Sequence, residues 1–261
     1  MLKNRRRFLH VAGLGLLGYA GSAALATLPR AQAQSSSLSI QWLGHTCFLF
    51  SGEGVRVLVN PFRTLGCTAG YRLPRPSADI VLISSQLFDE GAADNLPGNP
   101  PILFEPGPQF QTLKGREFEF KGIGLAHDRK GGRRFGTNVA WGWRQGGINI
   151  LHLGGAAAPI EIEQQILMGR PDLLLVPVGG GPKAYNPQEA LAAIQTLRPR
   201  IAIPTHYRTQ AADPAACDIV PLEEFLALNP YPVSRLGGDT ITLSPGNLPA
   251  ETVVRVLSYA F

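Results

Sequence analysis

The side chains best suited to metal or acid–base chemistry gather where segments that read as strands come to an end. One apolar segment, Val81–Glu90, runs into a loop that carries two adjacent carboxylates, Asp89 and Glu90. Imidazole and carboxylate groups bind divalent metals, and imidazole also moves protons near neutral pH. Loops at strand ends carry the sites of layered folds. Each histidine taken alone also fits a structural role, but four together favour a shared cleft. The histidines in question are His45, His127, His152 and His206.

The elements that would position these groups alternate between strands and a few helices, which favours a layered α/β fold over a doubly wound sheet. A helix over Pro159–Met168 is expected to turn Ile160, Ile166 and Leu167 toward the core. A second helix over Pro187–Leu197 has Asn186 as its cap and Glu189 at the capping-box position. The predicted strands are 38–42, 47–50, 55–59, 79–84, 101–104, 117–127, 137–143, 148–153, 173–176, 201–203, 234–235, 240–243 and 253–257. Residues 38–261 are expected to form one domain, after a polar linker at 34–37.

The N-terminus has the features of a twin-arginine export signal. Within Asn4–Leu9, paired arginines are followed by one free position and then Phe-Leu. An uncharged run over Val11–Leu28 and a small-x-small cleavage site at Ala31–Ala33 come next. Residues 1–33 are therefore predicted to be removed, which implies a periplasmic or otherwise exported protein and transient binding to the twin-arginine translocon. An uncleaved anchor is the alternative, since about 20 apolar residues span a bilayer. After cleavage, no stable membrane anchor is expected.

The net charge of the chain belongs to this signal. The chain has 24 basic and 19 acidic residues, and residues 1–33 hold five of the basic ones and none of the acidic ones. The mature protein is formally neutral, so its charge gives no support for a nucleic-acid partner. Three cysteines are too few for a disulfide scaffold. Cys47 reads as a core thiol, whereas Cys67 and Cys217 lie in loops, and the sequence leaves open whether they pair.

Segments spread over nearly the whole mature chain resemble the metallo-β-lactamase superfamily, in particular its branch of ascorbate-phosphate-lactonase-like hydrolases. The resemblance implies a four-layer αββα sandwich, with two mixed sheets face to face and helices outside. It also implies a dinuclear metal centre that activates water for hydrolysis of an ester, lactone or phosphoester. The segments that carry it are Trp42–Thr46, Val57–Phe62, Ile80–Glu90, His152–Gly155, Pro177–Gly180, Asn186–Ala190 and Pro204–Tyr207.

The metal-binding motif of that superfamily is degenerate here. Members usually carry His-x-His-x-Asp-His after the strand that corresponds to residues 80–84. By this resemblance the two histidines of the first metal position fall on Ser85 and Leu87, and only His152 is kept. At the second position Asp89 and His206 are kept, the histidine falls on Glu90, and the bridging aspartate falls on Gly155.

The expectation is therefore at most one divalent ion, zinc, manganese or iron, bound by Asp89, Glu90 and His206. His152 is the remaining candidate ligand of the first position, and His152 or His127 would assist proton transfer. A small molecule is the expected ligand. The alternative is a pseudoenzyme, a binding or scaffold protein that keeps the fold without metal.

Two basic clusters are further candidates. Lys183 follows the glycine run Gly179–Gly181 and could meet an anion. Arg129, Lys130, Arg133 and Arg134 lie in one Gly-containing loop, which is more typical of a solvated hairpin tip than of a phosphate contact.

Overall fold

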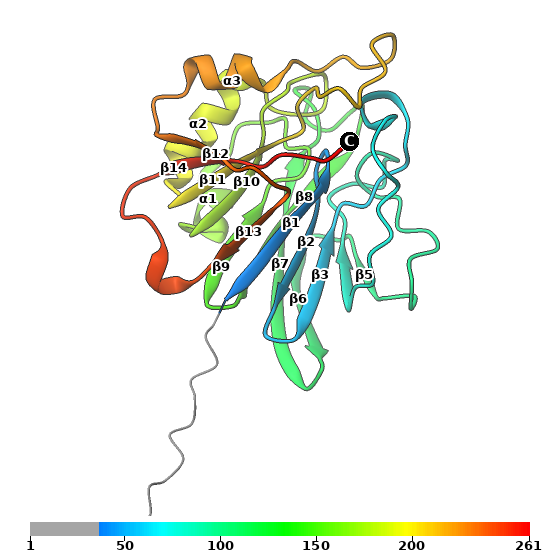
Figure 1. Cartoon of the computed structure of the whole chain (residues 1–261), viewed down its shortest axis with the longest axis vertical. Helices are drawn as coiled ribbons and strands as arrows, with labels where there is room; N and C mark the ends of the chain where they lie inside the picture. Colours follow the sequence, from blue (N-terminus) through cyan, green and yellow to red (C-terminus); the bar gives the residue numbers. More distant parts are fainter. Residues whose placement is uncertain (1–36) are drawn as a thin grey trace, which may run out of the picture. The chain divides into compact units, whose positions relative to one another are not determined.

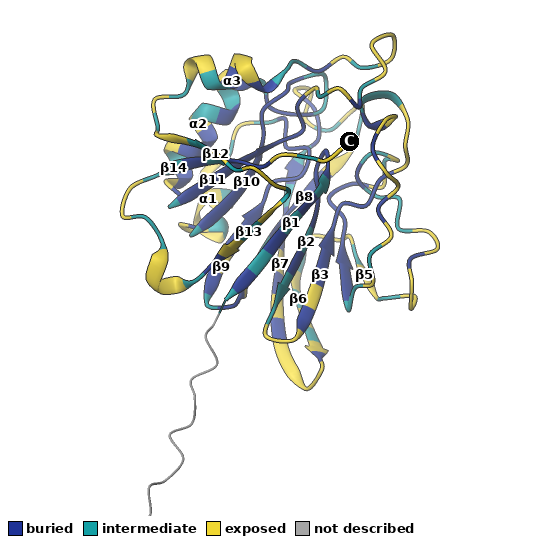
Figure 2. Cartoon of the chain, in the orientation of Figure 1, coloured by how far each residue is buried: buried dark blue, intermediate teal, exposed yellow. Residues whose placement is uncertain are grey.

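The computed structural model describes residues 37–261, in which fourteen strands form two mixed sheets (Figure 1). The predicted export signal, 1–33, and most of the predicted linker lie outside the described residues. Figure 2 shows burial concentrated in the strands, while the tip of the β6–β7 hairpin is exposed. The predicted sandwich of two mixed sheets is confirmed.

The smaller sheet begins with an antiparallel meander of β1, β2 and β3, which the sequence predicts from its glycine turns. β4 and β5 then continue the sheet in parallel, and β13 pairs with the other side of β1. Its strands, in spatial order, are β13 (Thr240–Leu243), β1 (Leu38–Gly44), β2 (Cys47–Gly52), β3 (Val55–Val59), β4 (Ile80–Leu82) and β5 (Ile102–Leu103).

The larger sheet is parallel from β12 to β9 and antiparallel from β9 to β6. β10 and β11 are buried along their whole length, as expected of central parallel strands. The spatial order is β12 (Val233–Arg235), β14 (Val253–Val256), β11 (Ile201–Thr205), β10 (Leu173–Pro177), β9 (Ile148–His152), β8 (Thr137–Gln145), β7 (Arg116–Ala126) and β6 (Gly107–Leu113).

Aromatic side chains from both sheets interlock in the core. The ring of Phe50 in β2 meets that of Trp143 in β8 edge to face, with centroids 4.9 Å apart. Phe120 in β7 lies 6.3 Å from the same indole, and Phe48 lies 6.3 Å from Phe50. Each such ring buries about 150–250 Å² of surface. This contact holds the two sheets face to face.

Three α-helices complete the described chain, α1 (Ile162–Met168), α2 (Pro187–Leu197) and α3 (Leu222–Leu228). α2 packs on β10 and begins with the predicted capping box, in which the backbone N–H of Glu189 donates to the Asn186 side chain at 2.8 Å. The expectation for α1 was wrong in part. Ile166 and Leu167 are 74% and 60% exposed, because this short helix contacts β7 and α2 with its other side.

Two further features are settled by the fold. Cys67 and Cys217 form a disulfide that joins loops 150 residues apart in sequence, and Cys47 is a buried free thiol in β2. Within residues 37–261 there is no helix with both the length and the apolar character needed to cross a membrane.

Candidate functional site

His45 is held in a tight turn between β1 and β2. Gly44 and His45 have φ angles of +109° and +50°, and a Cβ on Gly44 would lie 2.6 Å from the ring of Tyr71. The indole of Trp42 donates to the His45 carbonyl at 3.1 Å. A non-glycine residue in the left-handed region is uncommon and is a pointer to function. The turn therefore fixes the backbone from which the imidazole projects.

His206 follows β11 directly and is also left-handed, with φ +51°. Its carbonyl accepts a hydrogen bond from the N–H of Gly179 at 2.9 Å, and a Cβ at Gly179 would overlap that oxygen. One function of the predicted glycine run is thus this close approach of backbone to backbone.

Asp89 lies in a turn after β4 whose start is anchored to both sheets. The N–H of Ser84 donates to the side chain of Asn60 at 2.8 Å, and the N–H of Val139 in β8 donates to the carbonyl of Ser84 at 2.7 Å. The turn closes where the N–H of Gly91 donates to the Leu87 carbonyl at 2.7 Å. The carboxylate of Asp89 accepts a hydrogen bond from the ammonium group of Lys183.

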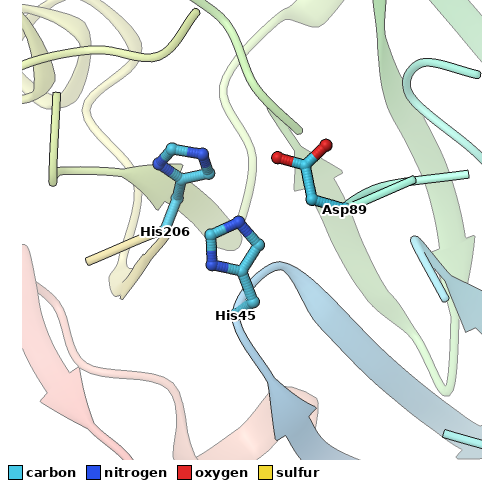
Figure 3. A group of neighbouring side chains, drawn as sticks. All are labelled: His45, Asp89 and His206. Carbon is cyan, nitrogen blue, oxygen red and sulfur yellow. The ribbon is translucent and has the colours of Figure 1, made fainter. Parts of the chain in front are cut away.

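His45, Asp89 and His206 converge, with one ligand atom from each residue within 4.8 Å of the others (Figure 3). The two imidazole rings lie 4.3 Å apart, centroid to centroid. Neither nitrogen of His45, nor Nδ1 of His206, has a hydrogen-bond partner among residues 37–261. Buried polar atoms are normally paired, so these nitrogens are available to a ligand. Two histidines and one carboxylate fit a single divalent ion.

The protonation states also fit metal coordination. Burial lowers the pKa of His45 to about 4 and the pKa of His206 well below its ordinary value, so both rings are neutral at pH 7. Burial raises the pKa of Asp89, but the charge and hydrogen bond of Lys183, together with His45 and His206, outweigh this effect and bring the pKa to about 2. Neutral imidazoles and an ionised carboxylate are the forms that bind metal.

A pocket of about 520 Å³ opens over this group. The Cys67–Cys217 disulfide lies in its wall and ties together two of the loops that surround it. The remaining wall carries both apolar and basic side chains, including Leu65, Phe88, Arg134, Phe135, Lys183 and Ile219. The site is therefore built for a small molecule with both charged and apolar parts.

Glu90, expected as a ligand beside Asp89, does not join the converging group. Its side chain turns away and accepts a hydrogen bond from the hydroxyl of Ser85 at 3.2 Å. Nε2 of His127 lies 3.6 Å from the same carboxyl oxygen. Burial raises the pKa of Glu90 to about 8, and the charge of Asp89 adds to this effect. Glu90 and His127 thus form a second buried pair behind the first group.

His152, expected as a ligand or a proton-transfer group, is bonded on both ring nitrogens. Nε2 donates to the carbonyl of Thr46 at 3.0 Å, and Nδ1 accepts from the N–H of Gly154 at 3.0 Å. Its ring also packs edge to face against Phe48. In this arrangement His152 links β9 to the turn that carries His45, and neither nitrogen is open to an ion.

The third member of the converging group, His45, lies at a predicted strand end but is not among the ligands that the superfamily motif implies. The superfamily motif places its ligands after β4, β9 and β11, so it does not point to the turn after β1. The available signal was the Gly44-His45 pair at a hairpin, where a left-handed residue is expected.

Comparison with known proteins agrees with the fold. Residues 39–206 match the model of the beta-lactamase superfamily domain. A UPF0173 metal-dependent hydrolase of Thermoplasma acidophilum is 28% identical over 191 residues, 66% of this chain and 84% of that protein. A UPF0173 protein of Pyrococcus furiosus is 30% identical over 194 residues, 68% of this chain and 87% of its own.

The solved structures add a three-dimensional match. A crystal structure of a metallo-beta-lactamase superfamily member from Thermotoga maritima superposes with a TM-score of 0.65 at 28% identity, covering 85% of this chain and 100% of that one. The matched residues contain all three members of the converging group. The chain belongs to the beta-lactamase superfamily and is similar to its metal-dependent hydrolases.

Proposed function

We propose that this protein is an exported hydrolase whose pocket holds one divalent ion on His45, Asp89 and His206. The observation that carries the proposal is the convergence of the three ligand atoms within 4.8 Å, with imidazole nitrogens that have no partner in the described chain. Three protein ligands that leave further positions open are typical of catalytic metal sites. When bound, the ion would polarise an ester, lactone or phosphoester and lower the pKa of water.

One ion fits better than two. By resemblance to the superfamily, the first metal position falls on Ser85 and Leu87, which offer one weak ligand and none. The bridging carboxylate falls on Gly155, where a Cβ would lie 2.6 Å from Nε2 of His127 and 2.8 Å from the carboxyl of Glu90. Side chains of this protein thus take up space around the bridging position of a dinuclear centre. We propose that the dinuclear centre is eroded to the mononuclear one.

The roles of the surrounding residues follow from their contacts. Asp89 and the two histidines orient the ion, and the pocket wall excludes water from the bound small molecule. His127 remains the candidate for moving a proton, because its ring nitrogens have no hydrogen-bond partner within residues 37–261. His152 holds the first turn in place through Thr46.

Export rests on the twin-arginine motif at Arg5–Arg7 and is supported by the disulfide. Structural disulfides persist in oxidising compartments, of which the periplasm is one, and are rare in the cytosol. A fusion of residues 1–40 to a reporter, with and without Arg5→Lys plus Arg6→Lys, tests export. Loss of the periplasmic signal in the paired-lysine form is expected, and equal export of both forms would remove this part of the proposal.

One observation favours a second candidate, a metal-free binding protein. The ammonium of Lys183 already forms an ion pair with Asp89, so the converging group has a cation of its own. In this second candidate the pocket binds its ligand without hydrolysing it. Membership of a fold does not decide between the two, since function resides in the site.

Metal analysis distinguishes these candidates. The exported protein would be purified, exposed to zinc or manganese, desalted and measured by mass spectrometry. We expect about one ion per chain, with loss of the ion in His45→Ala, Asp89→Asn and His206→Ala. Glu90→Gln is the matched control and should keep it, because Glu90 faces Ser85 and His127. Below about a tenth of an ion in the wild type, the level of adventitious binding, the metal-free candidate stands instead.

A chromogenic panel of one ester, one lactone and one phosphoester then tests hydrolysis. Turnover that disappears in His45→Ala and survives in Glu90→Gln supports the proposed site. Full turnover in His45→Ala contradicts it.

A further inference from the structure

Lys183 occupies an unusual place at the converging group. Its ammonium group binds the Asp89 carboxylate, and both side chains line the pocket, at 22% and 17% exposure. Burial is the main influence on the pKa of His45, His127 and Glu90, and the charge of Lys183 acts on all three in the lowering direction. The ammonium therefore sits where its field reaches the whole site.

A divalent ion and this ammonium compete for one carboxylate. Both are cations, and the charge of Asp89 can neutralise only one of them at close range. Lys183 holds Oδ2 of Asp89, so an ion placed as proposed above would share the single charge of this carboxylate, repel the ammonium and weaken the bond between Lys183 and Asp89. The cost of that exchange weakens binding of the ion unless the ammonium finds another anion.

The backbone that carries Lys183 is fixed, so the exchange has to occur by side-chain rotation. Arg129 is predicted to lie in a solvated hairpin tip, but its side chain instead binds the loop that carries Lys183. Its guanidinium donates to the carbonyls of Gly181 and Ala184, each at 2.9 Å, on either side of Lys183. It also makes two hydrogen bonds to Glu189, which caps α2. The four-carbon stem of lysine allows the ammonium to move while the loop stays in place.

The pocket supplies the space for a new anion beside Lys183. Its wall near the site is apolar at Phe88, Phe135 and Ile219. A small organic carboxylate with an apolar body matches both the ammonium and this wall. The exposure of the Lys183 side chain shows that the ammonium is reachable from the pocket.

We infer that Lys183 exchanges Asp89 for the carboxylate of a bound ligand when the metal ion takes Asp89, so that ion and carboxylate bind with positive coupling. The inference rests on the proposed function, because it needs the ion at Asp89. No covalent bond forms or breaks, and each carboxylate ends beside one cation, Asp89 beside the ion and the ligand beside Lys183. By linkage, the ligand then tightens the ion by the same factor as the ion tightens the ligand.

The test is calorimetric titration of zinc into chelator-treated full protein, alone, with benzoate, and with benzamide as the uncharged match. In the wild type we expect benzoate to tighten zinc binding about fivefold or more, and benzamide to leave it unchanged. Lys183→Met, which keeps the length and removes the charge, should bind zinc more tightly than the wild type and lose the effect of benzoate. Lys183→Arg keeps a cation and should keep the effect.

The outcomes separate this inference from the proposed function. Zinc that binds the wild type and Lys183→Met equally, or a benzoate effect that survives in Lys183→Met, overturns the exchange while the metal site stands. Absence of zinc binding in the wild type and in both variants overturns the proposed metal site and the exchange with it.

Discussion

Nε2 of His127 lies 2.6 Å from the position that a Cβ on Gly155 would occupy. Gly155→Ala should therefore destabilise the protein by about 1–3 kcal/mol, because overpacking in a tight interior forces neighbours to shift. Urea unfolding followed by tryptophan fluorescence measures the change. Gly237→Ala, at a glycine with open space around it, is the matched control and should cost little.

A double-mutant cycle locates the cause. In a His127→Ala background the cost of Gly155→Ala should shrink, since the nearest atom is gone. Equal costs in both backgrounds would show that His127 is not the obstacle. Restoring an aspartate at this position alone is accordingly expected to disturb the fold and not to rebuild a second metal site.

His152→Gln should reduce stability by about 2–3 kcal/mol while leaving metal stoichiometry unchanged. The ring is fully buried and bonds Thr46 and Gly154, so its replacement leaves buried groups unpaired. Unfolding by urea and metal analysis of the same sample check the two parts. Loss of metal from a variant that is still folded would assign His152 to the metal site after all.

The same residue gives a pH dependence. Burial lowers the pKa of His152 to about 4, partly offset by its bond to Thr46, so the folded protein excludes a proton that the unfolded chain binds below pH 6.5. His152 therefore contributes to the free energy of unfolding above pH 6.5, and this contribution is lost as the pH falls to 4. The slope is about 1.4 kcal/mol per pH unit. The difference in free energy of unfolding between wild type and His152→Gln should narrow as the pH falls over this range, when measured with chelator present. A constant difference would contradict the assignment of this pH dependence to His152.

Removal of the disulfide should lower the free energy of unfolding by about 2–5 kcal/mol, because the bond closes a loop of 150 residues. The double variant Cys67→Ser plus Cys217→Ser is compared with the wild type in urea, each with and without dithiothreitol. Reductant should shift the wild type toward the double variant and leave the double variant unchanged. A response of the double variant would mean that reductant acts elsewhere than on this disulfide, for example on a mixed disulfide formed by Cys47.

Local patterns predicted most elements well, and the misses have physical causes. The hairpin glycines defined β1 to β3 and β8 to β9, and the capping residues defined α2. β6 is absent from the predicted strands because it starts with Gly107-Pro108, and the structure shows it as an edge strand with Phe110 72% exposed. α3, with seven residues, is too short for a clear helical period.

The candidate site was predicted in two of its three residues. Asp89 and His206 follow from the superfamily motif, whereas His45 does not. The turn that holds His45 belongs to the smaller sheet and His206 follows a strand of the larger one. A period-two pattern states which face of a strand is buried, but only the packing of the sheets decides which strand ends meet.

Hydrogen bonds between the end of β4 and β8 limit how this protein can adapt to a ligand. The carbonyl of Ile83 accepts from the indole of Trp141 at 3.0 Å, and that of Ser84 accepts from the N–H of Val139 at 2.7 Å. The loop that carries Asp89 therefore starts from a point common to both sheets. Because both sheets anchor this stretch of backbone, it is preorganised, and ligand binding costs little free energy for ordering it. We therefore expect adaptation to a ligand to come from the side chains that line the pocket rather than from this backbone.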